Sequence, residues 1–251
     1  MHYPSSSFVY GAGAYSKHFA DVFSFCSNPA ALGNTTVGAV GVANELKFLL
    51  DAPGSYTIAA SLPISLGGIG INCNHSGLDA YKETRAGLAY GKCLGPVAIG
   101  AQFNYTSISI AGYGKVSVIH FDLGTIWQVS EKLYSGIRIK NPIGGKFGSI
   151  GNEKLAFDYT IGLGYEASES VFIRTEIIKE EDRSVNVLLS LNYRLDNKFY
   201  LRGGISTATT SPWLSGGLAW KNIRVDITSS FHPQLGITPG LSLIYSAIKH
   251  Q

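Results

Sequence analysis

The chain has 251 residues, enough for one sizeable domain, and only 15% of them are charged. Soluble domains usually carry roughly 25% charged residues, yet no run of about 18 apolar residues is present to form a transmembrane helix. The net charge of +3 is too small and too scattered to indicate nucleic-acid binding. The apolar residues alternate with polar ones, which predicts strands, and strands in a lipid bilayer must close into a barrel.

Residues 1–34 are the first predicted region, and they do not alternate. A serine run and the Gly11–Ala14 run precede a short stretch, residues 15–25, that favours a helix. The region lacks the basic start and apolar core of a signal peptide, so we expect the numbering to begin in or near the mature chain. We predict that residues 1–34 form an N-terminal hatch in the lumen or at the periplasmic mouth, and that residues 35–251 form the barrel.

Period-2 alternation, the signature of strands, begins after Gly33 and continues to the end of the chain. It is clearest at 184–194, where the two faces carry Val185, Val187, Leu189, Leu191 and Tyr193 against Asn186, Ser190, Asn192 and Arg194, with Leu188 as the exception. Similar patterns lie at 97–106, 155–166, 171–178 and 223–230. We predict an all-β fold, a transmembrane antiparallel β-barrel of about 14 strands.

The predicted turns are of two kinds, which indicates how the barrel is oriented. Very short turns, near residues 65–67, 92–95, 130–132, 167–169, 196–197 and 221–222, alternate with mostly longer ones near 51–55, 76–81, 110–114, 141–152, 180–183, 209–212 and 232–239. Outer-membrane barrels have short periplasmic turns and longer extracellular loops. Aromatic residues beside the short turns would form an interfacial girdle: Tyr90, Trp127, Tyr165, Tyr193, Phe199, Trp220 and Tyr245. A soluble β-sandwich, the alternative, would need polar outward faces.

The polar strand face would line the lumen and carries charges of both signs. The main set is Arg138, Arg174, Glu176, Arg194, Arg202, Arg224 and Asp226, joined by Glu83, Arg85, His120, Asp122, Lys140 and Asp158. We expect Glu176 to lie between Arg174 and Arg194, and Asp226 near Arg202 or Arg224. The set is either a network of salt bridges that holds the barrel rigid or a selectivity lining for an ion or polar solute. Small lumen residues such as Gly100 and Gly162 would leave room for the hatch.

Catalysis is not predicted. No G-x-S-x-G motif is present, and His120 with Asp122 is a pair that is common on polar strand faces. We predict no metal site and no cofactor, since no spacing of metal ligands and no dinucleotide-binding loop appears. Cys26, Cys73 and Cys93 are odd in number, so free thiols are expected.

Two motifs resemble a known family. Asn28-Pro29-Ala30, within Ser27 to Gly33, is a turn signal before the first strand and is similar to the hatch motif of FadL-like barrels, closest to PorV/PorQ-type proteins of the Bacteroidetes lineage. Residues 230–242 look like the closing hairpin of the PorV-type barrels. The resemblance implies a bacterial outer-membrane location and a gate at Asn28, Pro29 and Ala30.

The resemblance implies two functions. PorV-type proteins are accessory subunits that work with secretion machinery (type IX secretion), and FadL-type proteins transport hydrophobic compounds. Because a fatty-acid conduit requires an apolar pocket and this lumen is predicted to be polar, the sequence favours an accessory subunit bound to outer-membrane lipid and other envelope proteins. A FadL-like channel for a small solute is the alternative.

Overall fold

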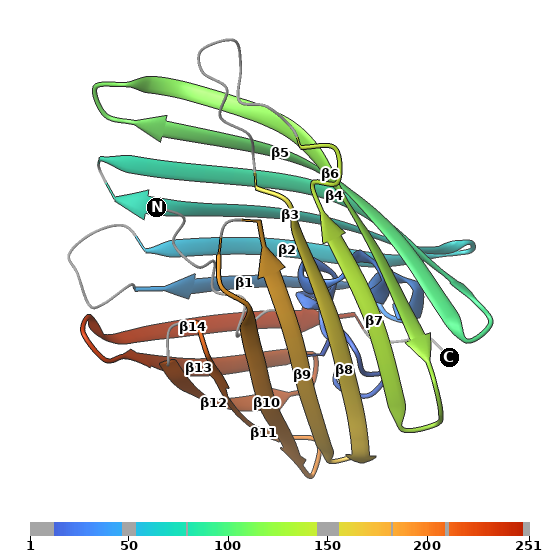
Figure 1. Cartoon of the computed structure of the whole chain (residues 1–251). Helices are drawn as coiled ribbons and strands as arrows, with labels where there is room; N and C mark the ends of the chain where they lie inside the picture. The colour runs from blue at the N-terminus through green and yellow to red at the C-terminus, as the bar shows by residue number, and fades with distance from the viewer. Residues whose placement is uncertain are drawn as a thin grey trace.

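The computed structural model describes residues 13–46, 54–78, 80–144, 156–181, 183–208 and 211–247. Fourteen antiparallel strands form one closed barrel, in which each strand pairs with its sequence neighbours and β1 pairs with β14 (Figure 1). The strands are β1 (Ala39–Glu45), β2 (Ser55–Ile64), β3 (Gly67–Leu78), β4 (Tyr81–Leu94), β5 (Val97–Ile110), β6 (Gly114–Gln128), β7 (Leu133–Lys140), β8 (Asp158–Ser168), β9 (Val171–Glu180), β10 (Asn186–Leu195), β11 (Phe199–Ser206), β12 (Ser211–Trp220), β13 (Ile223–His232) and β14 (Gly236–Ser246). The predicted fold class is confirmed.

The alternation in the sequence becomes the two faces of the barrel wall, because successive side chains of a strand point to opposite faces. In β10, Val187, Leu189 and Leu191 are exposed on the outside, whereas Ser190 and Asn192 are buried inside. Leu188, the exception in the pattern, is buried on the lumen face. An exposed apolar outer face suits lipid and excludes the soluble sandwich, whose outward faces would be polar.

The two rims differ, but less than predicted. The connections of one rim are short, as at Gly95-Pro96 and Lys221-Asn222. We call it the periplasmic rim, because outer-membrane barrels have their short turns on that side. Two connections of the other rim, between β3 and β4 and between β5 and β6, are only two and three residues long, whereas 17 residues separate β7 from β8. The seven aromatic residues of the predicted girdle are all exposed on the outer face. No helix among the described residues is long and apolar enough to cross a membrane.

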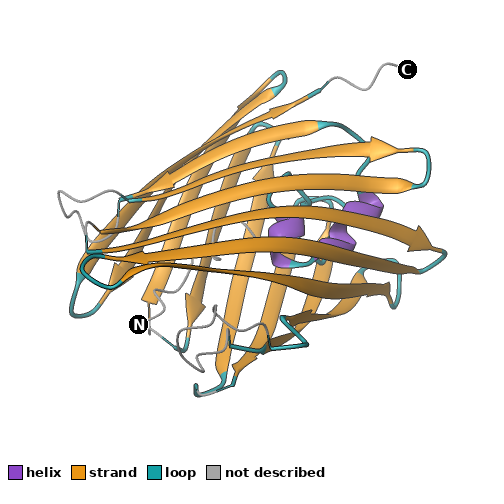
Figure 2. Ribbon diagram, turned by 90° about the horizontal axis from the view of Figure 1, so that it is seen from above, coloured by secondary structure: helices purple, strands orange, loops and turns teal. Residues whose placement is uncertain are grey.

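The described part of the N-terminal region, residues 13–34, lies inside the barrel near the periplasmic rim, and we call it the hatch segment (Figure 2). It contains the short helix α2 (Ser24–Ser27) and the 3-10 helix η1 (Pro29–Asn34). Val22, Phe23, Phe25 and Leu32 of this segment are buried and form a small apolar core with Ala59, Ala89 and other lumen residues of the barrel. The apolar core of the molecule is therefore inside the lumen, between hatch and wall.

Candidate functional site

A row of four glycines on the barrel wall receives the hatch segment. Gly68, Gly91, Gly100 and Gly124 are register partners across β3, β4, β5 and β6. A side chain on any of them would overlap the hatch: Leu32 at the first, Pro29 at the second and third, and Asn28 at the fourth. Glycine is required here by close approach of two backbones, one of the uses of a residue without a Cβ. We call these residues the glycine row.

The predicted motif Asn28-Pro29-Ala30 lies against this row and begins η1. Asn28 Oδ1 accepts the Ala30 backbone N–H at 3.0 Å, which caps the 3-10 helix. Asn28 Nδ2 donates to the carbonyls of Thr125 at 3.2 Å and Ile137 at 3.3 Å, on the adjacent strands β6 and β7. Asn28 therefore both shapes the hatch and attaches it to two strands.

Arg138 of β7 holds the preceding turn of the hatch. Its Nη1 donates to the carbonyls of Ser27 at 2.7 Å and Cys26 at 3.3 Å, and its Nη2 lies 3.5 Å from Asp158 Oδ1. The carbonyls at the end of a helix have no partner within the helix, and a cation is favourable there. Arg138, predicted only as part of a lumen charge network, is thus a direct contact of the hatch.

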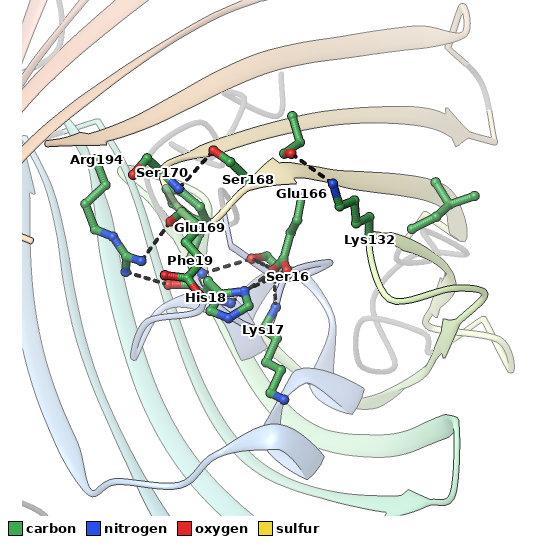
Figure 3. A network of polar contacts seen from close by, with 12 residues as sticks. Ser16, Lys17, His18, Phe19, Lys132, Glu166, Ser168, Glu169, Ser170 and Arg194 are labelled. Atoms are coloured by element: carbon green, nitrogen blue, oxygen red, sulfur yellow. Dashed lines mark hydrogen bonds and ion pairs between the residues drawn. The ribbon is translucent and has the colours of Figure 1, made fainter.

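The beginning of the hatch is bound by a carboxylate of β8 (Figure 3). Glu166 Oε1 accepts the Ser16 hydroxyl at 2.5 Å and the backbone N–H groups of Lys17 at 2.7 Å and His18 at 3.0 Å. Glu166 Oε2 lies 2.7 Å from His18 Nδ1. Four contacts to one nearly fully buried carboxylate fix this turn of the hatch, since hydrogen bonds to a charged acceptor are stronger than neutral ones.

A four-membered charge cluster holds the middle of the hatch against the opposite wall. Asp21 Oδ2 lies 2.7 Å from Arg224 Nη2 and 3.9 Å from Arg202 Nη1, while Asp226 Oδ2 lies 2.8 Å from Arg202 and 3.0 Å from Arg224. The predicted proximity of Asp226 to Arg202 or Arg224 is thus found for both arginines. The two carboxylates balance the two guanidinium groups, so the buried charges are paired.

The expected bridge of Glu176 between Arg174 and Arg194 does not form. Glu176 Oε2 lies 3.5 Å from Arg174 Nη2, and its other oxygen accepts from Ser27 Oγ at 3.4 Å. Arg194 lies at the periplasmic end of β10 instead, where it donates to the carbonyls of His18 and Glu169 and covers the ring of Phe19. The face of the strand was predicted correctly, but the height of Arg194 along the barrel separates it from Glu176.

The structure also places the His120–Asp122 pair and the three cysteines that the sequence singled out. His120 Nε2 and Asp122 Oδ1 are 3.9 Å apart on the lumen face of β6. All three cysteines are free thiols, as expected. Burial, together with the negative charge of Asp21, raises the pKa of the hatch thiol Cys26 to about 12. This thiol is therefore protonated and weakly nucleophilic at neutral pH.

A cavity lies between the hatch segment and the wall at the periplasmic mouth. Its volume is about 380 Å³, and its lining includes Asp21, Val22, Phe25, Lys221, Arg224 and Ile244. This volume is at the lower end of the range for small-molecule sites. The hatch thus fills the periplasmic half of the lumen but leaves a space beside β1, β2 and β11–β14.

Sequence reasoning missed three parts of this site, namely the glycine row, Asp21 and Glu166. Each of the four glycines can be seen in the sequence, but only Gly100 was predicted to face the lumen, and their alignment across four strands was not predicted. Aligning the strands by their turns would have brought the four into register. Asp21 and Glu166 form their contacts between segments about 150–200 residues apart, for which the local pattern carries no signal.

Comparison with known proteins supports the fold. No protein-family model matches the chain, and no curated protein is similar to it in sequence. Solved structures are similar: the CymD monoaromatic hydrocarbon channel has a TM-score of 0.74 at 13% identity, with 99% of this chain and 98% of that chain covered. The Ralstonia pickettii toluene transporter TbuX has a TM-score of 0.65 at 13% identity, covering 90% and 92%. A Pseudomonas aeruginosa FadL homologue has a TM-score of 0.60 at 11% identity, covering 94% and 96%.

The shared architecture extends over nearly the whole chain, so the barrel is FadL-like in fold. It is the fold of a bacterial outer-membrane barrel, in agreement with the predicted location. CymD is a monoaromatic hydrocarbon channel and TbuX is a toluene transporter. Nothing among them supports the predicted closeness to PorV-type proteins.

Proposed function

We propose that this protein is an outer-membrane channel for a small solute and that the hatch segment is its gate. The observation that carries the proposal is that a segment continuous with the barrel only through β1 fills the periplasmic half of the lumen by non-covalent contacts. Hydrogen bonds and ion pairs of this kind can break and re-form, unlike the paired backbone of the wall. The similarity to a monoaromatic hydrocarbon channel and to a toluene transporter favours the same class of function.

The lumen chemistry separates this chain from a simple hydrocarbon conduit. Buried lumen side chains above and beside the hatch are mainly polar or charged, among them Asn104, His120, Asp158 and Ser190. Pockets for apolar ligands are lined predominantly by apolar and aromatic groups. We therefore expect the solute to carry a polar group.

A reversible cross-link between hatch and wall tests the gate. A Cβ built on Gly41 of β1 lies 2.6 Å from Val22 Cγ1, which makes the two thiols of V22C/G41C neighbours, and it lies 2.7 Å from the Phe23 ring, which must move aside. The variant is made with Cys26, Cys73 and Cys93 replaced by Ser. In stopped-flow swelling of liposomes in arabinose, we expect the oxidised protein to be several-fold slower than the reduced one. V22C alone, treated identically, is the control, and G41C alone is a second control because of its contact with Phe23.

Equal swelling rates before and after reduction would remove the hatch as a gate. Rates no higher than those of empty liposomes in both states would remove the channel itself. The accessory-subunit role predicted from the sequence would then gain support if a mild-detergent pull-down recovered stoichiometric envelope proteins with this barrel.

A further inference from the structure

A group of buried hydrogen-bond donors faces the lumen on β9, β10 and β11. Arg174, Ser190, Asn192 and Arg202 are 2%, 4%, 1% and 5% exposed. Arg174 is the register partner of Ser190, and Asn192 is the register partner of Arg202, so the four side chains are contiguous on one face. We call them the donor patch.

Several polar atoms of the donor patch have no hydrogen-bond partner in the part of the chain that the structure describes. They are Arg174 Nε and Nη1, Ser190 Oγ, Asn192 Nδ2 and Arg202 Nε. The arginines reach their carboxylates only through other atoms: Arg174 Nη2 toward Glu176 at 3.5 Å and Arg202 Nη2 toward Asp226 at 2.8 Å. Buried polar groups are hydrogen-bonded in nearly all native proteins, so such a concentration requires a partner from outside the wall.

The chemistry of these atoms selects the partner. Guanidinium and amide N–H groups donate only, and the Ser190 hydroxyl can donate as well. Their complement is a group that only accepts, and a carboxylate offers two oxygens with about four acceptor positions. Two guanidinium groups add geometry suited to a planar oxyanion.

An aromatic side chain lies beside the donors. Ser190 of β10 is the register partner of Gly204 on β11, and Gly204 is the register partner of Trp213 on β12. A Cβ on Gly204 would lie 2.7 Å from Trp213 Nε1, so the indole leans over this glycine toward Ser190. Leu188, two residues before Ser190, is buried on the same face. A flat apolar body next to the carboxylate would therefore meet a ring and an aliphatic side chain.

We propose that the donor patch and Trp213 form a binding site for a small aromatic carboxylate. This inference rests on the proposed channel function and names the class of its solute. The guanidinium groups, Ser190 and Asn192 bind the carboxylate, and the Trp213 indole contacts the ring.

Trp213 provides the readout. The sequence has three tryptophans, so W127F/W220F leaves Trp213 as the single reporter. This protein, in detergent micelles, is titrated with benzoate and with benzamide, which has the same shape but a neutral group that also donates. We expect a saturable change of Trp213 fluorescence with benzoate, and at least tenfold weaker binding of benzamide.

Two double variants in the same background locate the site. S190A/N192L removes the neutral donors without changing charge, and we expect about tenfold weaker benzoate binding with an unchanged or raised Tm, because both groups are unpaired in the fold. N104L/T106V is the control on β5: it removes the unpaired Asn104 Nδ2 and Thr106 Oγ1, together with Asn104 Oδ1, which accepts from Gln102 Nε2 at 2.8 Å. We expect it to bind benzoate as the parent does.

Three results would overturn the site: no saturable response to benzoate, equal binding of benzamide, or equal losses in the two double variants. A fall in Tm for S190A/N192L with unchanged affinity would also overturn it, since the two groups would then act within the fold. None of these results affects arabinose flux through the reduced V22C/G41C protein, so failure of this site and failure of the channel are distinguishable.

Discussion

The lumen holds the hatch segment by two different means on its two sides. The wall of β3–β6 presents glycines, and the backbone of the hatch lies directly on the backbone of the strands. The wall of β8–β13 presents Glu166, Arg202, Arg224 and Asp226, which bind the hatch through charge. Close backbone contact dominates the first side. On the second side Tyr15 also lies on Gly162 and Gly164 of β8, but the carboxylate contacts of the hatch gather there. A gate needs contacts that can be released, and only the charged side can be weakened by protonation, salt or a competing anion.

Filling the glycine row should have the largest effect. In G124V the new side chain would overlap Asn28 and Pro29 Cδ, so the hatch cannot seat beside β6. Overpacking typically costs about 1–3 kcal/mol and occasionally more. We expect a cost above about 3 kcal/mol here, because the new Cβ would lie well within 3.0 Å of Asn28 Oδ1, and with it a lower Tm and faster arabinose-dependent swelling. G216V is the matched control, because a Cβ on Gly216 meets no atom within 4 Å. Similar swelling rates for the two variants would show that seating on the glycine row does not close the lumen.

Removing a charge from the opposite side should have the next largest effect. D21N leaves Arg202 and Arg224 with Asp226 as their remaining carboxylate partner in the cluster. Breaking a buried ion pair costs about 3 kcal/mol at the lower end of its range, and the loss falls on the hatch. We expect trypsin to cleave D21N after Lys17 faster than it cleaves the control variant D196N, as measured by mass spectrometry. Asp196 lies in an exposed periplasmic turn. Equal cleavage would mean that the glycine side alone holds the hatch.

The sequence predicted the wall better than the contents of the lumen, for a physical reason. Whether a residue points in or out depends only on its parity along a strand, so the lumen positions of Arg174, Arg202 and Asp226 followed from alternation. Which lumen residues meet depends on strand stagger and on where the hatch lies. That is why Asp226 was placed near its partners on neighbouring strands, whereas Arg194 was wrongly paired with Glu176. Asn28 was singled out from its motif, but its contacts with β6 and β7 needed the folded barrel.

Neutralising Glu166 should give the smallest effect, and it tests whether the charged side acts at the beginning of the hatch as well as at Asp21. E166Q keeps an oxygen that can accept from Ser16, Lys17 or His18 but loses the charge. Hydrogen bonds to charged groups contribute roughly 1.5–3 kcal/mol against about 1 for neutral ones, so we expect a loss near 1 kcal/mol. The Lys17 and His18 amides both donate to Glu166, so they should exchange with deuterium about fivefold faster, since 1 kcal/mol is a factor of about 5.

E169Q, at an exposed site next to the same rim, should leave these two amides unchanged. If exchange at Lys17 and His18 is the same in E166Q as in the parent, the start of the hatch is held by its other contacts, among them the hydrogen bond from Arg194 to the His18 carbonyl. Of the two carboxylates Glu166 and Asp21, only Asp21 would then matter for holding the hatch.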